Sequence, residues 1–241
     1  MERVLRYLAD MDDCFAERRV PLPFGTALFC DALRRVWDLN FVRVESRDVE
    51  IEAMLAETER VQAEAGLAHR KLKLPFEARV PDGWKPTRLV VMVHRGSVPE
   101  TTGPVEEVDA GALRETWEHE TRSTYHDEET VRQLIAARLV RDAAAGPRYF
   151  AARVDDGLVS ECSLFSDGRI AEVDAVTTIE AYRGRGLAKA VVARTVEAAY
   201  RAGHDLVFLL ADADDWPKEL YRRLGFEEIG STWELLLEAQ P

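Results

Sequence analysis

Alternating and helically spaced apolar residues divide most of the chain into short strands and helices. From residue 105 onward the pattern predicts strands at 105–108, 149–154, 158–165, 170–178, 206–210 and 232–237, and helices at 112–120, 128–142 and 187–202. Asp155-Asp156-Gly157 and Asp167-Gly168 break the pattern and predict turns between neighbouring strands. Strands that alternate with helices indicate an α/β protein in which helices cover a sheet.

A shorter run of elements before residue 98 repeats the order found near the other end of the chain. The pattern predicts strands at 37–44, 69–74 and 89–93 and a helix at 49–65. Gly83-Trp84 precedes the last of these strands, as Gly225-Phe226 precedes the strand at 232–237. The segment 95–104 between the halves is rich in Pro and Gly, which is typical of a domain boundary. We therefore expect two related domains, 1–98 and 105–241.

The turn between the strand at 170–178 and the helix at 187–202 predicts an anion site. Its sequence is Arg183-Gly184-Arg185-Gly186-Leu187-Ala188. The first N–H groups of a helix lack intrahelical acceptors, and two glycines let a phosphate or pyrophosphate approach the main chain closely. Arg183 and Arg185 add charge at the rim. A Walker loop requires Gly-Lys-Ser/Thr, and a dinucleotide fingerprint requires a third glycine where Lys189 stands, so neither class fits.

A second motif, Leu220-Tyr221-Arg222-Arg223-Leu224-Gly225-Phe226, follows after one more strand. In this order and spacing the two motifs resemble the acetyl-CoA site of the GNAT superfamily of N-acetyltransferases. The resemblance covers the chain from about residue 105 onward. It implies a mixed β-sheet flanked by helices, of the α+β type within the α/β class, and acetyl-CoA as the acyl donor.

The resemblance also assigns roles to individual residues. It implies that the donor is bound by Val176, Thr177, Thr178, Arg183, Gly184, Arg185, Gly186, Leu187 and Ala188. Tyr221 occupies the family's position for the general acid that protonates the leaving thiolate, and a phenol has a suitable pKa for that task. Asp214 stands where many relatives have an asparagine, and we expect its carboxylate to face solvent or to cap the next helix.

A general base is expected on the strand at 170–178, where many GNAT enzymes have a glutamate. Glu172 is the leading candidate, and Asp174 and a path through water remain alternatives. Strict alternation places Glu172, Asp174 and Val176 on one face, unless a bulge reverses the facing.

The resemblance extends to the N-terminal half as a degenerate, truncated GNAT-like domain in a tandem arrangement. The turn that corresponds to 183–186 is Glu45-Ser46-Arg47-Asp48, which has no glycine and carries acidic charge. We therefore expect one CoA per chain, bound by residues after about 105.

Composition narrows the class of protein further. The net charge of −12 argues against nucleic acid as a partner and is compatible with a cationic acceptor. No apolar run is long enough to span a membrane, and the start of the chain lacks the apolar core of a signal peptide, so we expect a cytoplasmic protein without a membrane partner. The three cysteines and five histidines are dispersed, and no metal site is expected.

These observations predict an acetyl-CoA-dependent N-acetyltransferase that acts on a primary amine of a small molecule or peptide. The alternative is a non-enzymatic acyl-CoA-binding sensor or pseudoenzyme. An acyltransferase acting on aminoacyl-tRNA is disfavoured by the acidic charge. The sequence does not define the oligomeric state.

Overall fold

The computed structural model describes residues 1–101 and 103–238. The helices are α1 (Glu2–Phe15), α2 (Ile51–Glu64), α3 (Arg114–Thr124), α4 (Glu128–Ala145), α5 (Leu187–Arg201) and α6 (Pro217–Arg223), with 3-10 turns η1 (Trp37–Leu39) and η2 (Glu180–Tyr182). The strands are β1 (Arg18–Leu22), β2 (Gly25–Phe29), β3 (Phe41–Val44), β4 (His69–Leu74), β5 (Lys85–His94), β6 (Val105–Val108), β7 (Arg148–Val154), β8 (Gly157–Ser166), β9 (Ile170–Thr178), β10 (Leu206–Asp212) and β11 (Phe226–Glu238).

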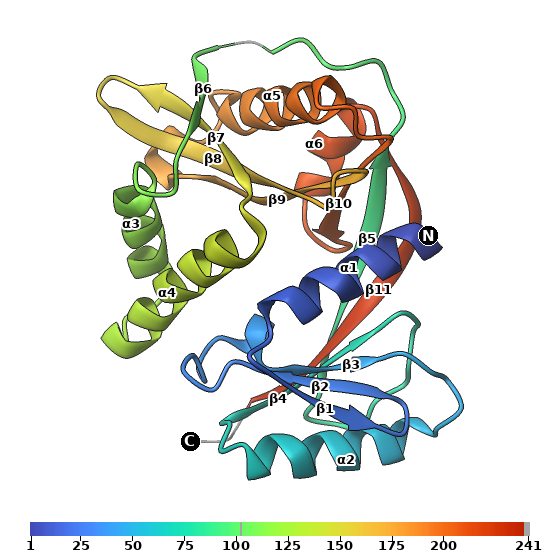
Figure 1. Cartoon of the computed structure of the whole chain (residues 1–241). Helices are drawn as coiled ribbons and strands as arrows, with labels where there is room; N and C mark the ends of the chain where they lie inside the picture. Colours follow the sequence, from blue (N-terminus) through green and yellow to red (C-terminus); the bar gives the residue numbers. More distant parts are fainter. Residues whose placement is uncertain (102, 239–241) are drawn as a thin grey trace.

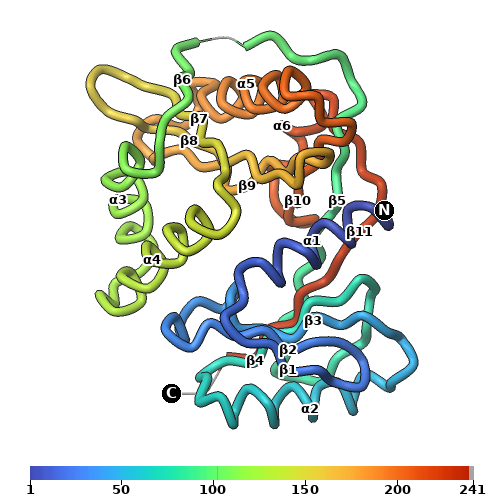
Figure 2. The backbone as a smooth tube through the Cα atoms, viewed as in Figure 1, coloured from blue at the N-terminus to red at the C-terminus, as the bar shows by residue number. Residues whose placement is uncertain are grey.

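Within these residues the strands form one mixed sheet of 11 strands, in the order β1-β2-β3-β4-β11-β5-β10-β9-β8-β7-β6 (Figure 1). Two pairs, β3 with β4 and β9 with β10, are parallel, and a helix connects the strands of each pair. The sheet is strongly twisted, so that the two halves of the molecule lie one above the other in the view of Figure 2. The mixed α/β class predicted from the sequence is confirmed.

Strands β5 and β11 join the two halves of the sheet. β5 lies before residue 98 in sequence, yet it pairs on one side with β10 and on the other with β11. β11 comes from the far end of the described chain and pairs with β4 as well as with β5. The division into domains 1–98 and 105–241 stays a prediction, and no gap in the hydrogen-bonded sheet accompanies it among the described strands.

Helices cover the sheet on both faces and define its cores. Over the C-terminal half, α5 covers one face, where its buried residues pack on β7 to β10. The opposite face is covered by α1, which packs on β5, β9 and β10, and by α3 and α4. α2 covers the outer face of the N-terminal half (Figure 1). Helix α1 thus lies between the two halves.

The strands and helices predicted after residue 105 are present with shifts of a few residues at their ends. The region before residue 37 was not assigned from the sequence, and it holds α1, β1 and β2. None of the helices in the described part of the chain is long and apolar enough to cross a membrane.

Candidate active site

The parallel strands β9 and β10 separate where their connecting helix begins. They pair at only three positions, the last of which joins Glu172 to Phe208, and beyond this point the two strands diverge. Open α/β sheets bind ligands in such crevices, at the carboxyl ends of parallel strands. The motif residues after β9 therefore lie at an opening in the sheet.

The glycine turn at the start of α5 has the geometry that its sequence predicts. Gly184 and Gly186 have φ angles of 76° and 79°, a region that favours glycine, and an added Cβ at either position would meet no described atom within 4 Å. Gly186 is the N-cap of α5, and no side chain among the described residues caps this end, so its first N–H groups face the open space. The residues present fit a pyrophosphate.

The two arginines of the turn donate hydrogen bonds to carbonyl groups of nearby residues. Arg183 donates from Nε to the carbonyl oxygen of Thr178 at 3.1 Å, and Arg185 donates to the carbonyl of Ala181 at 3.3 Å. Both side chains are exposed. They are therefore placed to turn toward an anion at the rim of the turn.

A bulge in β9 changes which residues share its face. Ser163 of β8 pairs with Asp174 and Glu161 pairs with Thr177, so two residues of β9, Ala175 and Val176, stand opposite one residue of β8. Ala175 has a φ of 53°, which is rare for a residue other than glycine.

The bulge corrects one expectation from alternation. Thr177 lies on the face of Glu172 and Asp174, whereas Val176 packs against the core beneath α5. The bulge also aims backbone groups of 175–177 away from the regular ladder, at the place where the strands diverge.

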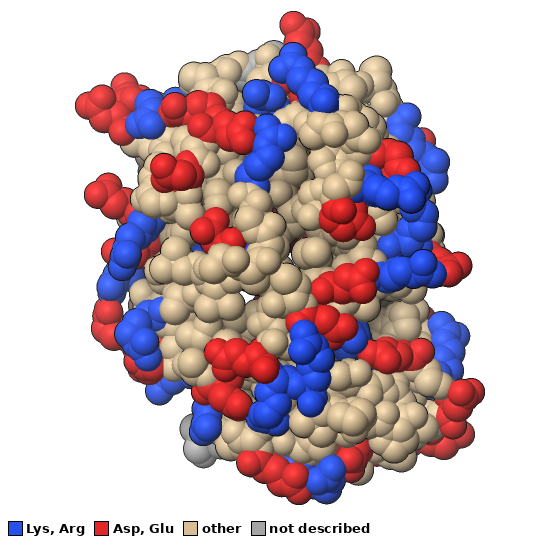
Figure 3. Space-filling model, in the orientation of Figure 1, with Lys and Arg blue, Asp and Glu red and all other residues tan. Residues whose placement is uncertain are grey.

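A cavity of about 490 Å³ opens beside the bulge, on the face of the sheet opposite α5. Its walls come from β9, from helices α3 and α4, and from the η1 region of the N-terminal half. Its charged lining residues are Asp38, Glu120, Arg138, Arg141 and Asp174. Figure 3 shows the molecular surface hollowed near its middle, between the upper and lower halves.

The two carboxylates of β9 have different surroundings. Asp174 lines the cavity, and its Oδ2 lies 3.6 Å from Nη1 of Arg141. Glu172 is half-buried and is not among the residues that line the cavity. Burial and then the neighbouring charge of Asp174 raise the pKa of Glu172 to about 8. At neutral pH Glu172 is therefore mostly protonated in the free protein.

Tyr221 lies in α6 with only 7% of its surface exposed, and its ring packs edge-on against Phe226 at 6.2 Å between centroids. Burial raises its pKa to about 12, and the charges of Cys162 and Asp174 add to this effect. Tyr221 belongs to the core cluster that also contains Cys162 and Val176, and the phenol remains a proton donor at neutral pH.

Glu161 is a further charged residue near the cavity, and it was not singled out from the sequence. Its fully buried carboxyl accepts a hydrogen bond from Nε1 of Trp117 at 2.6 Å and one from Arg138 at 3.1 Å. Burial raises its pKa to about 7. A lone acid in the apolar run 158–165 is the signal that could have identified it.

Asp214 is exposed, and its backbone N–H donates to Oδ1 of Asp212 at 2.8 Å. In residues 1–101 and 103–238, no group of three or more His, Cys, Asp or Glu side chains is arranged to hold a metal ion.

Comparison with known proteins identifies the region around this site. Residues 145–228 match the family described as the acetyltransferase (GNAT) domain. No curated protein matches the sequence. Among solved structures, a functionally unknown conserved protein from Staphylococcus epidermidis has a TM-score of 0.72 at 12% identity and covers 92% of this chain and 93% of its own.

Two further solved structures are similar. A GCN5-related N-acetyltransferase from Kribbella flavida has a TM-score of 0.67 at 19% identity, covering 99% of this chain and 95% of that one. A tandem GNAT protein from the clavulanic acid biosynthesis pathway has a TM-score of 0.55 at 17% identity, covering 83% and 76%. At these identities the likeness is one of fold, and it extends over both halves of the chain.

Proposed function

We propose, from the membership of residues 145–228 in the GNAT acetyltransferase domain family, that this protein is an acetyl-CoA-dependent N-acetyltransferase. Its acceptor is a primary amine of a small molecule or peptide. The observation that carries the proposal is the position of the β9 bulge. Val176 of the bulge packs against the core cluster that contains Tyr221, β9 leads into the uncapped glycine turn at α5, and Asp174 beside the bulge lines a cavity.

The glycine turn and the open strand end bind the donor in this proposal. Backbone N–H groups of 184–188 receive the pyrophosphate, and Arg183 and Arg185 supply positive charge beside it. The main chain of Val176, Thr177 and Thr178 borders the crevice where β9 leaves β10, and in this proposal it pairs with an extended arm of the donor along the edge that β10 does not occupy. The thioester supplies an activated acetyl group.

The chemistry at the bulge needs two proton transfers. The attacking amine must lose a proton as the C–N bond forms, and the sulfur must gain one as the C–S bond breaks. Tyr221 is the proton donor to the sulfur, because its raised pKa keeps it protonated. Glu172, Asp174 or a water path takes the proton from the amine, and Asp174 lies on the cavity wall from which an acceptor approaches.

The charges that line the cavity favour a cationic acceptor. Asp38, Glu120 and Asp174 contribute three carboxylates to its wall, against Arg138 and Arg141. An ammonium group would therefore enter a region of negative potential.

The alternative function is an acyl-CoA-binding sensor or pseudoenzyme. The observation that favours it is the protonation of Glu172 at neutral pH. A carboxyl group that is protonated at neutral pH takes no proton from an amine. A bound ammonium would lower this pKa by its charge, so the outcome depends on the acceptor.

The decisive experiment is a screen of amine libraries with acetyl-CoA, in which release of free thiol is measured. We expect turnover with at least one cationic amine and much slower turnover by the Tyr221→Phe variant. Calorimetric binding of acetyl-CoA without any amine-dependent thiol release would instead favour the sensor, and absence of both binding and turnover would contradict either function.

A further inference from the structure

The N-terminal half contains a second parallel pair of strands that opens in the same way as β9 and β10. β3 and β4 are connected by α2 and pair at two positions only, the last of which joins Arg43 to Lys73. Beyond these residues the strands diverge, as β9 and β10 do beyond Glu172. By topology alone, the carboxyl ends of β3 and β4 are a place where a ligand would bind.

A cavity of about 330 Å³ occupies this place, between the strand ends and α1. This volume is at the lower end of the range of about 300–1,000 Å³ for small-molecule sites. The roof is α1, and the floor runs across β3, β4, β11, β5 and β10. Its apolar lining includes Leu5, Leu8 and Ala9 of α1 and Leu74, Leu210 and Trp233 of the sheet.

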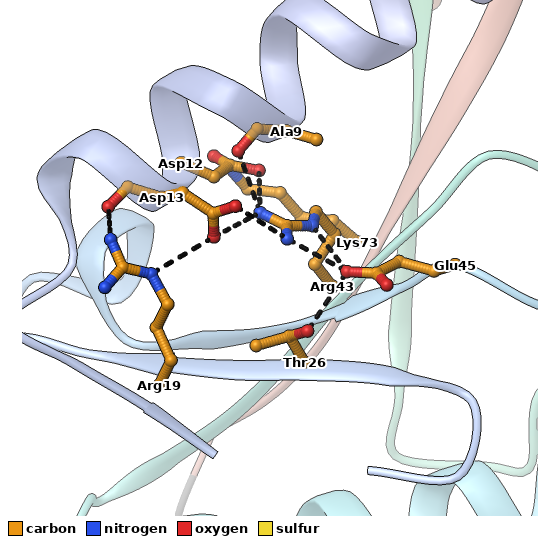
Figure 4. Close-up of polar contacts among 8 residues, drawn as sticks. All are labelled: Ala9, Asp12, Asp13, Arg19, Thr26, Arg43, Glu45 and Lys73. Carbon is orange, nitrogen blue, oxygen red and sulfur yellow. Dashed lines mark hydrogen bonds and ion pairs between the residues drawn. The ribbon is translucent and has the colours of Figure 1, made fainter. Parts of the chain in front are cut away.

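The charged side chains of the cavity wall are paired with one another. Arg43, which is 13% exposed, makes ion pairs with Asp13 at 3.1 Å and Glu45 at 2.9 Å, and donates to the carbonyl of Ala9 at 3.0 Å (Figure 4). Lys73 pairs with Asp12 at 3.3 Å.

On the β11 side of the same wall, Glu234 pairs with Lys71 at 2.8 Å. An ionic ligand would have to separate these pairs, whereas an uncharged ligand would leave them intact.

The turn at 45–48, beside this cavity, disfavours the binding of a nucleotide phosphate. Ser46 donates to Oδ2 of Asp48 at 2.7 Å and accepts from the N–H of Asp48 at 3.1 Å, so the turn at 45–48 is closed by its own hydrogen bonds. Glu50 is the N-cap of α2 and Glu52 lies in its first turn, where acidic charge repels a phosphate.

We propose that the cavity under α1 is a second binding site, and that its ligand is an uncharged, mainly aliphatic or aromatic small molecule. The site is separate from the donor site at 176–188. It does not depend on the acetyltransferase activity.

The probe for this site is N-phenyl-1-naphthylamine, an uncharged aromatic amine whose fluorescence rises in apolar surroundings. We expect saturable binding of one probe per chain, with no displacement by saturating CoA. Ala9→Phe places a ring in the cavity from the roof and should weaken binding at least tenfold. Ala56→Phe, on the exposed face of α2, is the matched control and should bind as the unaltered protein does.

Thr232→Phe fills the same cavity from β11 and provides a second variant if Ala9→Phe does not fold. Circular dichroism and thermal unfolding identify the folded variants. Unchanged probe affinity in a folded filling variant, displacement by CoA, or lack of saturable binding would each overturn the proposal. Because none of these readouts measures acetyl transfer, failure here and failure of the proposed function are distinguishable.

Discussion

Burial has opposite consequences for Glu172 and Tyr221. In both side chains it disfavours the ionised form and raises the pKa, to about 8 for the carboxyl and to about 12 for the phenol. For a proton donor this is an advantage, because Tyr221 stays protonated through the physiological range. For a base it is a handicap below pH 8. The same physical effect therefore favours one assigned role and makes the other depend on pH.

The pH dependence of turnover tests the role of Glu172. If Glu172 is the base, kcat/KM rises with pH through about 8, since the carboxyl must ionise first. Glu172→Gln should remove this rise of kcat/KM with pH. Asp174→Asn should move the rise to lower pH, because the charge of Asp174 is the second cause of the raised pKa of Glu172. A pH profile unchanged in the Glu172→Gln variant would assign the base to Asp174 or to water.

Tyr221→Phe isolates the phenol hydroxyl. The ring packing against Phe226 is kept, so we expect acetyl-CoA affinity to be preserved while kcat falls by about 10- to 10⁴-fold, the range for lost general-acid catalysis. Stopped-flow thiol detection and calorimetry on the same preparation separate the two quantities. Equal kcat in the variant would exclude Tyr221 as the acid.

At the scale of elements, the turn before α5 and the turn after it provide a matched pair of glycines. Gly186 and Gly203 have φ angles of 79° and 90°, and an added Cβ at either position meets no described atom within 4 Å. Valine at either position costs about 1–2 kcal/mol of backbone strain.

Only Gly186→Val should also impair CoA binding, because it disturbs the N–H groups that receive the phosphates. The loss of one charge-assisted hydrogen bond corresponds to roughly a 10- to 100-fold weaker Kd. Calorimetry on the two variants gives the comparison, and equal affinities would place the pyrophosphate elsewhere.

Arg43 of β3 is one of the side chains that connect helix α1 to the N-terminal half, through Asp12 and Asp13. Removal of its guanidinium leaves Asp12, Asp13 and Glu45 without their shared partner. We expect Arg43→Met to lower the free energy of unfolding by about 2 kcal/mol, less than the about 3–5 kcal/mol of a fully buried pair because the carboxylates are partly exposed.

Urea denaturation measures the effect of Arg43→Met. A double-mutant cycle with Asp13→Asn measures how much of this free energy comes from the Arg43–Asp13 ion pair. Additive effects in the cycle would show that the two side chains are not coupled.

Of the two features that were not predicted, helix α1 has a sequence pattern and the β9 bulge has none. Val4, Tyr7, Leu8 and Met11 have the spacing of an amphipathic helix, so α1 was available from the pattern. The β9 bulge was not, because Ala175 has no sequence signal for its positive φ. Glycine motifs are local and were found, whereas the facing of Val176 depends on pairing with β8.

At the scale of the whole molecule, the shared strands predict a single cooperative transition. β5 of the N-terminal half pairs with β10 and β11, and β11 of the C-terminal half pairs with β4 and β5, so each half contributes a strand whose partners belong to the other half. We expect urea unfolding followed by tryptophan fluorescence and by circular dichroism to coincide. A fragment of residues 100–241 lacks β5 and should not fold. Two separate transitions, or a folded fragment, would show that the halves are independent.

The candidate acceptor cavity also belongs to the whole molecule. Val36 and Asp38 from the N-terminal half and Asp174 from the C-terminal half line it together. The sequence predicted two related halves but not which of their surfaces face each other, since that arrangement follows from long-range strand pairing.

The position of β11 between β4 and β5 has a consequence for synthesis on the ribosome. β4 and β5 emerge early, but the strand that lies between them in the sheet, β11, is made after all other described strands. At about 5–20 residues per second, the edges of β4 and β5 that face β11 in the finished sheet stay unpaired for on the order of 10 s after β5 is made. Such edges are templates for aggregation, so the nascent chain is a natural client for a chaperone until translation brings β11 into place.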